Sequence, residues 1–227
     1  MQRQREMNKE RLNMVEKCEC GLSYVIGEPE DERWHCIVHE NYLTGPKLPI
    51  LLNGKKVGKF DDFIVVQVSD ESTEKLRSSA SELALTAHYS TPDYPAGYDG
   101  SVGHELKVYA LLYGEHAIGF LLRSKTTRSW HLRWNGEGKA ELVTNDANLD
   151  KRIVVARLWI AKHYHRKGFA RRMIETTAIA ENQEISNIVY QLPFTPAGKC
   201  LIQAIAPDTW FGDGDSFDFK DILKSST

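Results

Sequence analysis

The sequence predicts a mixed α/β fold, an α+β arrangement of helices packed on one mixed sheet, preceded by a small Cys/His segment. Short apolar or β-branched runs alternate with segments whose apolar residues recur every three or four positions. After residue 48 the main segments follow the order β-α-β-β-β-α-β-α, to which one more amphipathic strand is added below, and this order is typical of a mixed sheet covered by helices. Ahead of them, three of the four cysteines lie within residues 18–36, which indicates a separate small unit.

The composition is that of an ordinary globular protein. The 227 residues are 41% hydrophobic and 26% charged, close to the averages for that class, and the length fits one domain of about 170 to 200 residues with a small appendage. A net charge of -2 gives no overall attraction to nucleic acid or to an anionic membrane surface. The chain has no apolar run of about 18 residues and no leader-like start. We therefore expect an intracellular protein without membrane contact; the composition does not separate cytoplasm from nucleus.

Local composition sets the domain boundaries. Residues 1–14 are polar without apolar periodicity, so we expect a flexible arm. The stretch 43–49 contains two prolines and a glycine and is typical of a linker. Residues 15–47 then form the Cys/His unit, and residues 48–227 form the larger domain.

The first half of the larger domain is predicted as a strand, a helix and a hairpin. The β-branched run 63–68 predicts a strand, and apolar residues at helical spacing predict a helix over 74–88. The stretch 89–104 is rich in proline and glycine, and a loop of that length is usually functional or disordered, so we expect it to border an active site. Two apolar strands follow as a hairpin, over 107–112 and 117–122.

The second half repeats the alternation of strands and helices. After a more amphipathic strand over 129–134, the nearly continuous apolar run 153–160 predicts a central strand. The periodicity then changes and predicts an amphipathic helix over 167–181. A further strand is expected over 185–192 and a short helix over 196–206.

The segment 151–172 carries an unusual concentration of charge. It holds eight Lys or Arg residues and no acid, although the whole chain is slightly acidic. A strand followed by a turn and a helix start at Gly168 leaves several backbone N–H groups pointing at one spot, which suits a phosphate. Gly168 allows a pyrophosphate to approach the backbone, with Arg166, Lys167 and Arg171 around it. A solvated basic helix start is the alternative, although helix starts normally favour acidic residues.

This turn also carries a family motif. The string His165 to Ala170 (HRKGFA) resembles the signature of the GNAT superfamily of acetyl-CoA-dependent acetyltransferases: Arg or Gln, two residues, Gly, one residue, then Gly or Ala. His165 takes the Arg/Gln position, where an imidazole N–H can also face a phosphate. The resemblance covers about residues 60–206, including the hairpin. It implies cofactor contacts from the backbone of Leu158, Trp159 and Ile160 to the pantetheine arm, and from Arg166, Lys167, Gly168, Phe169, Ala170 and Arg171 to the pyrophosphate.

The Cys/His unit has the donor set of a CCHH-type zinc finger. Cys18 and Cys20 are followed after fourteen residues by His35 and His39, whose i, i+4 spacing puts both imidazoles on one helix face. Two thiols and two imidazoles suit a tetrahedral Zn²⁺. Only one residue separates the two cysteines, where such fingers usually have two to four, and Cys36 should point elsewhere. Reduced cysteines packed as small apolar residues are the alternative.

Both motifs together resemble the sister-chromatid cohesion (cohesin) acetyltransferases, in which a small finger precedes a GNAT domain. The pattern Cys-Gly-x-x-Tyr followed by Pro-Glu-Asp-Glu-x-x-His-x-x-x-His is similar to that finger, and the run 157–160 (RLWI) is similar to the family's Arg-Ile-Trp-Val. The resemblance implies acetyl-CoA as co-substrate and Zn²⁺ as a structural metal. A third similar segment opens the last helix near the cofactor, and it contributes Thr195, Pro196 and Ala197.

Two positions depart from the cohesin pattern. Ala156 stands where the family has a serine, and Pro193 stands where it has a catalytic aspartate. A lysine amine with a pKa of about 10.4 is mostly protonated near neutral pH, so acetyl transfer requires a base. The superfamily's usual tyrosine acid would lie after residue 194, where the chain has no tyrosine. The base candidates, which spacing does not distinguish from surface groups, are His104, Glu105 and Glu141.

We expect an acyltransferase, an N-acetyltransferase that moves acetyl from acetyl-CoA to a lysine amine of a protein by direct transfer in a ternary complex. Three alternatives stay open: a small-molecule amine as acceptor, an acetyl-CoA sensor without turnover, and a non-catalytic nucleic-acid-binding finger protein with a GNAT-like fold. Nucleic acid is disfavoured, because one finger offers a small footprint and the net charge is negative.

Overall fold

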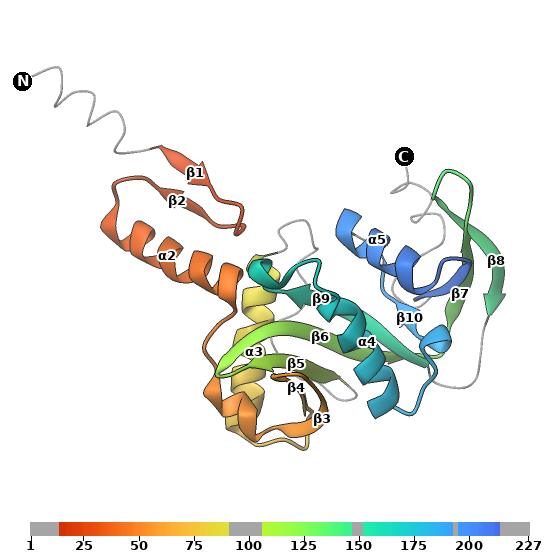
Figure 1. Ribbon diagram of the computed structural model, residues 1–227. Coiled ribbons are helices and arrows are strands. Elements are labelled where there is room, and N and C mark those ends of the chain that lie inside the picture. Colours follow the sequence, from red (N-terminus) through yellow and green to blue (C-terminus); the bar gives the residue numbers. More distant parts are fainter. Residues whose placement is uncertain (1–13, 91–105, 147–151, 193–194, 214–227) are drawn as a thin grey trace, which may run out of the picture.

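The computed structural model describes residues 14–90, 106–146, 152–192 and 195–213, which form a small N-terminal unit and a larger unit (Figure 1). The larger unit is a nine-stranded sheet with helices on both faces, so the predicted mixed α/β class is confirmed. Most of the expected arm, nearly all of the long loop predicted over 89–104 and the last residues of the chain lie outside the described residues.

The N-terminal unit, residues 14–45, is a hairpin joined to one helix. Strand β1 (Val15–Lys17) pairs antiparallel with β2 (Ser23–Val25), and α2 (Pro29–Thr44) follows. Asp31 accepts a hydrogen bond from the Val25 amide (3.0 Å), and Glu32 accepts one from the Gly27 amide (2.8 Å). These acids lie in the first turn, where negative charge is favourable. They therefore stabilise the helix and hold it to the hairpin.

The larger unit is built on nine strands. They are β3 (Lys55–Phe60), β4 (Phe63–Val68), β5 (Lys107–Tyr113), β6 (His116–Thr126), β7 (Ser129–Trp134), β8 (Ala140–Asp146), β9 (Arg152–Ile160), β10 (Val189–Tyr190) and β11 (Thr209–Asp213). They lie side by side in the order β3-β4-β5-β6-β9-β10-β11-β7-β8. Only the pairs β9–β10 and β10–β11 are parallel. The predicted central strand, β9, thus lies in the middle of the sheet.

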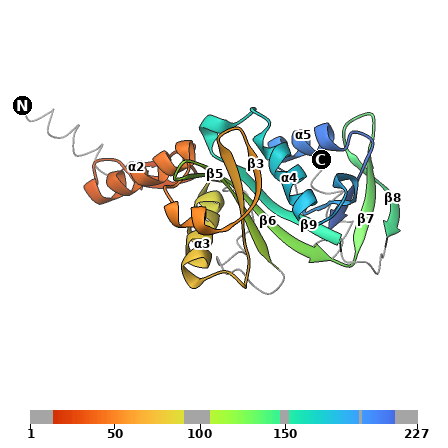
Figure 2. The same ribbon diagram turned by 60° about the horizontal axis from the view of Figure 1, so that its bottom comes forward.

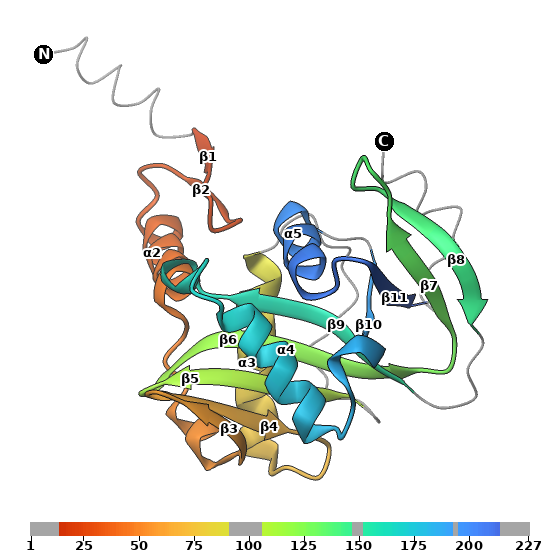
Figure 3. The same cartoon turned by 45° about the vertical axis from the view of Figure 1, so that its right-hand side comes forward.

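Three helices cover the sheet. Helix α3 (Glu74–Tyr89) lies on one face, and α4 (Phe169–Ala180) and α5 (Pro196–Ile205) lie on the other (Figures 2 and 3). The inward residues of α3 are small or aliphatic, and Leu83 at their centre is fully buried. On α4, Met173 is likewise fully buried against the sheet. None of the helices in the described part of the chain is long and apolar enough to cross a membrane.

The sequence did not predict three strands, β3, β8 and β11. Two of them, β3 and β8, are the edges of the sheet, and β3 carries three lysines, a charge pattern that protects exposed edges from further pairing. The predicted strand over 185–192 is a 3₁₀ turn, Ile185–Asn187, followed by the two-residue β10. The short length of β10 shapes the site described below.

The stretch expected to be a linker is packed against the sheet. The Pro46 carbonyl accepts from the Ala117 amide, and the Leu48 amide donates to the Glu115 carbonyl, both at 2.9 Å. Gly45 has φ +84°, and a Cβ there would lie 2.3 Å from the Ala117 oxygen, so only glycine fits. Helix α2 therefore leads directly onto the start of β6, and the N-terminal unit is fixed to the larger one.

Candidate active site and metal centre

Strand β9 loses its partner on one edge halfway along its length. Strand β10 pairs with β9 only at Val154 and Val155, and a last bond runs from the Gln191 amide to the Val155 carbonyl (3.1 Å). Beyond this point β9 continues to Ile160, paired with β6 on its other edge. No strand of the described part pairs with this edge of β9 beyond Val155.

The alternation of hydrogen bonds shows which residues face this open edge. The Ala161 amide donates to the Ile118 carbonyl of β6 (2.8 Å), so the backbone groups of Trp159, two residues earlier, also face β6. Those of Leu158 and Ile160 face the open edge. Of the three expected pantetheine contacts, the geometry thus turns two toward the opening and one away from it.

A β-bulge marks the point of divergence. The register between β6 and β9 shifts between Leu122 and Arg123, which leaves Ala156 as the extra residue on β9. Ala156 is the position where the cohesin pattern has a serine, and here it is buried. The bulge therefore brings no hydroxyl to the site.

The motif had suggested that the His165 ring faces a phosphate at the helix start, but the ring is hydrogen-bonded to the end of β9 instead. Its Nε2 donates to the Ile160 carbonyl (2.7 Å), because a carbonyl can only accept. Between these two residues lies the 3₁₀ turn Lys162–Tyr164. The imidazole therefore ties the turn to the end of β9, and the expected contact of this N–H with a phosphate is replaced by a structural one.

Helix α4 begins without an acidic residue or a capping side chain. Gly168 stands before its first residue with φ +80°, and a Cβ there would meet nothing within 4 Å. The Arg172 amide donates to the Gly168 carbonyl (3.1 Å), so the amides of Phe169, Ala170 and Arg171 precede the first intrahelical donor. This helix start is therefore suited to an anion, because free N–H groups and the helix dipole favour negative charge there.

The basic side chains around this helix start have different contacts. Arg166 and Lys167 are exposed, and the Lys167 ammonium lies 5.4 Å from the centre of the Tyr164 ring. Arg171 instead pairs with Glu175 one turn along its own helix (2.8 Å). Arg166 and Lys167 are thus placed better than Arg171 to meet an anion.

The Thr-Pro-Ala segment opens α5 on the same face of the sheet as α4. The Thr195 hydroxyl accepts from the Gly198 amide (3.1 Å) and caps the helix, while Pro196 takes a first-turn position where its missing N–H is not needed. Pro196 and Ala197 are exposed. The segment follows Gln191 by only four residues, so it lies near the point where β9 and β10 diverge.

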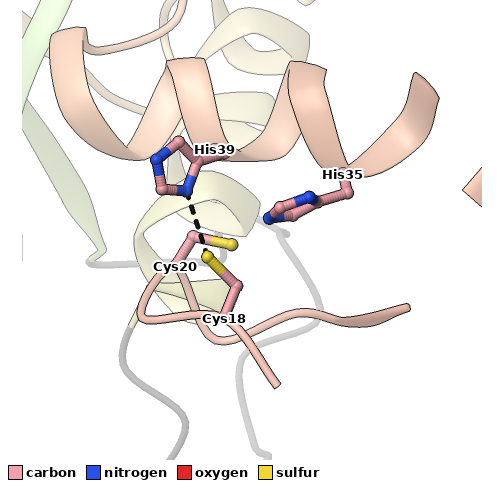
Figure 4. A group of neighbouring side chains, drawn as sticks. All are labelled: Cys18, Cys20, His35 and His39. Atoms are coloured by element: carbon pink, nitrogen blue, oxygen red, sulfur yellow. Dashed lines mark hydrogen bonds between the residues drawn. The ribbon is translucent and has the colours of Figure 1, made fainter. Parts of the chain in front are cut away.

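The structure brings Cys18, Cys20, His35 and His39 together (Figure 4). Their four ligand atoms lie within 4.8 Å of one another, and Cys18 Sγ is 3.1 Å from His39 Nδ1. The cysteines come from the turn between β1 and β2, and the histidines come from one face of α2. As expected, Cys36 is outside this cluster and exposed.

The cluster fits a zinc ion. Tetrahedral zinc with bonds of about 2.0 to 2.3 Å separates its ligand atoms by roughly 3.3 to 3.8 Å, within the spread found here. His35 Nε2 is buried and has no hydrogen-bond partner among the described residues, and the Tyr24 ring stacks on this imidazole at 3.9 Å. Burial raises the pKa of the Cys20 thiol, so a thiolate here needs a cation beside it.

Comparison with known proteins gives a match in structure alone. No family model matches the chain, and no curated protein matches its sequence. The xEco2 acetyltransferase domain bound to a CoA conjugate is similar with a TM-score of 0.59 and 16% identity, over 72% of this chain and 98% of that one. A second structure of the xEco2 acetyltransferase domain is similar with a TM-score of 0.55 and 16% identity, over 72% of this chain and 95% of that one. The chain therefore has the fold of this acetyltransferase domain.

Tyr190 is a residue of this acetyltransferase fold that the sequence reasoning missed. It is the last residue of β10, in register with Val155, and only 3% exposed. Its hydroxyl has no hydrogen-bond partner among the described residues, and burial raises the pKa of that hydroxyl. A tyrosine within the apolar run 185–192 was the available signal, but only the structure shows where the strand ends.

Of the three expected base candidates, Glu141 alone lies among the described residues. Glu141 lies on the β7–β8 hairpin, where it pairs with Arg133 (3.0 Å) and accepts from the Asn135 amide group (3.3 Å). His104 and Glu105 lie outside the described residues. The geometry therefore selects no general base from the three.

Proposed function

We propose that this chain is an acetyl-CoA-dependent N-acetyltransferase that moves the acetyl group to a lysine amine of a protein, by direct transfer in a ternary complex. The observation that carries the proposal is the open edge of β9, which ends beside a helix start without acids. In this reading residues 15–47 are a zinc finger and residues 48–227 are the acetyltransferase domain.

The two features suit the two ends of acetyl-CoA. The pantetheine arm contains amides that can pair with the backbone of Leu158 and with the amide N–H of Ile160, much as a strand would, while the Ile160 carbonyl accepts from His165. Its pyrophosphate would lie at the start of α4, against the amides that follow Gly168 and near Arg166 and Lys167. The segment 195–197 would border the cofactor on the α5 side.

Transfer requires one proton to leave the amine and one to reach the thiolate. The neutral amine attacks the thioester carbonyl, the C–S bond breaks, and the CoA sulfur takes up a proton. The Tyr190 hydroxyl is a buried proton donor where β9 and β10 diverge, so we assign it the second task. We leave the base unassigned.

Zn²⁺, when bound, would have four protein ligands and therefore a structural role. Cys18 and Cys20 would join the hairpin to His35 and His39 on α2. A separate observation opposes the nucleic-acid alternative: residues 14–45 carry seven acidic and two basic side chains, which repel a phosphate backbone.

Acceptor-dependent release of free CoA thiol tests the proposal. The purified chain is incubated with acetyl-CoA and either lysine-containing basic peptides, a polyamine or no acceptor, and peptide products are located by mass spectrometry. We expect thiol release with peptides and acetylation at lysine. Release with the polyamine alone would favour a small-molecule acceptor, and binding of acetyl-CoA without any release would favour the sensor.

A further inference from the structure

The loop that leads into α4, residues 162–168 and here called the cofactor loop, is held from two sides. On the inner side the Tyr164 ring packs against Phe169, Phe63 and Tyr113, with ring centres 6.0 to 6.3 Å apart. On the outer side Lys162 reaches the N-terminal unit. The loop is thus a bridge between the sheet and that unit.

Lys162 makes two contacts with the N-terminal unit. Its ammonium lies 3.5 Å from the Glu19 carboxylate and 5.8 Å from the centre of the Tyr42 ring. An ion pair and a cation–π contact on one ammonium restrain it more than either does alone. Because Glu19 offsets the charge of Lys162, this lysine is placed as a tether rather than as a phosphate ligand.

Both contact residues lie next to the metal cluster. Glu19 is the residue between the two cysteine ligands, and Tyr42 lies one turn after His39, with ring centres 6.2 Å apart. The hairpin that carries Glu19 has strands of only three residues, too short to be stable alone. Asp31 and Glu32 hold the end of the hairpin to α2, and the ligands of the cluster hold the turn that carries Glu19.

Within the cofactor loop, hydrogen bonds connect Lys162 to the protein groups that are proposed to bind acetyl-CoA. Its carbonyl accepts from the His165 amide (3.1 Å), and the His165 ring donates to the Ile160 carbonyl (2.7 Å). Gly168 follows His165 by three residues. His165 thus connects Lys162 to the end of β9 by hydrogen bonds, and the chain continues from it to the start of α4.

We propose that Lys162 is a positioning residue that couples metal binding in the N-terminal unit to acetyl-CoA binding at the cofactor loop. The inference rests on the proposed function, because it takes acetyl-CoA as the ligand of this loop. Coupling between two ligands is reciprocal, so zinc and acetyl-CoA should tighten each other's binding by the same factor. For one exposed ion pair with a cation–π contact we expect about threefold to tenfold.

The test measures both halves of this linkage. The dissociation constant of acetyl-CoA is measured by calorimetry on the zinc-loaded and the metal-stripped chain, and the zinc affinity is measured by chelator competition with and without acetyl-CoA. We expect the two ratios to agree within error and to exceed about three. Ratios of one in both experiments would overturn the proposal.

Variants separate a tether from a phosphate ligand. Lys162→Ala should weaken acetyl-CoA binding to the zinc-loaded chain and leave the metal-stripped chain unchanged, whereas loss of a phosphate ligand would weaken both. Lys162→Arg should keep the coupling. Lys139→Ala is the matched control. The Lys139 side chain is 45% exposed, close to the 43% of Lys162, and it pairs with Glu137 at 3.2 Å. Lys139 lies on the β7–β8 hairpin, away from the N-terminal unit.

The outcomes distinguish this proposal from the function on which it rests. If acetyl-CoA binds neither form of the chain, the proposed function fails. If it binds both forms equally, the coupling alone fails. If removal of zinc unfolds the chain, the zinc-loaded variants decide, because equal acetyl-CoA affinities of Lys162→Ala and Lys139→Ala would also overturn the coupling.

Discussion

At the scale of single residues, Glu181 is an acid whose side chain is only 6% exposed. It follows α4 and accepts from Lys107 (2.8 Å), Tyr109 and Arg123, which come from β5 and β6. Burial acts to raise the pKa of its carboxyl, but these donors outweigh it and hold the pKa below the usual range. The carboxylate thus locks the end of α4 to the sheet.

This lock makes stability depend on pH. The pKa of Glu181 is lower in the folded chain than the unfolded value of about 4.3, so its contribution is present above pH 4.3 and is lost as the pH falls through the folded pKa. Glu181→Gln removes the carboxylate that pairs with the buried Arg123 and should cost about 3 kcal/mol at pH 7. Urea unfolding between pH 7 and 3 should also show a flatter pH dependence for the variant; an unchanged slope would contradict the assignment.

Tyr190 provides a second prediction at this scale. Removing a buried hydroxyl without a partner leaves stability unchanged or raises it by about 1 kcal/mol, whereas removing a proton donor slows transfer by roughly 10² to 10⁴. Tyr190→Phe should therefore unfold at the same or higher urea concentration, bind acetyl-CoA normally and have a low kcat. A variant with the kcat of the parent chain would remove Tyr190 from the mechanism.

At the scale of elements, some features could be read from the sequence and others could not. The strand ending at Ile160 and the helix over 169–180 were predictable, because the change from a continuous apolar run to helical spacing is local. The end of β10 after Tyr190 was not, since pairing with β9 and β11 decides it. The direction of the Trp159 backbone groups, away from the open edge, was not predictable either, because it follows from the register of β9 with β6.

Substitutions at the junction between α2 and β6 test how the N-terminal unit packs against the sheet. Gly45→Ala combines a positive φ with a Cβ contact of 2.3 Å to backbone, so it should destabilise the chain by about 3 kcal/mol. Gly114→Ala has φ +58° but open space around its Cβ and should cost only about 1 kcal/mol. Equal losses in chemical denaturation would show that the packing at Gly45 is unimportant.

The metal cluster gives the second prediction for an element. The purified chain should hold about one equivalent of zinc, measured by elemental analysis after gel filtration. Cys20→Ser should lose the metal, and Cys36→Ser should retain it because Cys36 is exposed and outside the cluster. Zinc retained by Cys20→Ser would contradict the ligand set.

At the scale of the whole molecule, sequence motifs identified the segments of the candidate site, and the fold determined how they meet. The glycine turn and the Cys/His pattern were visible in the sequence because glycine before a helix and paired ligands are local signals. The contact of Lys162 with Glu19 joins residues 143 positions apart, and no local pattern predicts it. The packed stretch after Gly45 was likewise expected to be a linker, because its prolines indicate a turn but not what the turn contacts.

The central claim is that acetyl-CoA binds at the open edge of β9 with its pyrophosphate at the start of α4. The most direct measurement is calorimetry of acetyl-CoA with the parent chain, Gly168→Glu and Gly114→Glu. Both glycines have positive φ and open space, so the two substitutions carry similar strain, but only the first puts a carboxylate at the anion site. We predict micromolar binding by the parent and Gly114→Glu and its loss in Gly168→Glu; no binding by the parent, or equal binding by all three, would contradict the account.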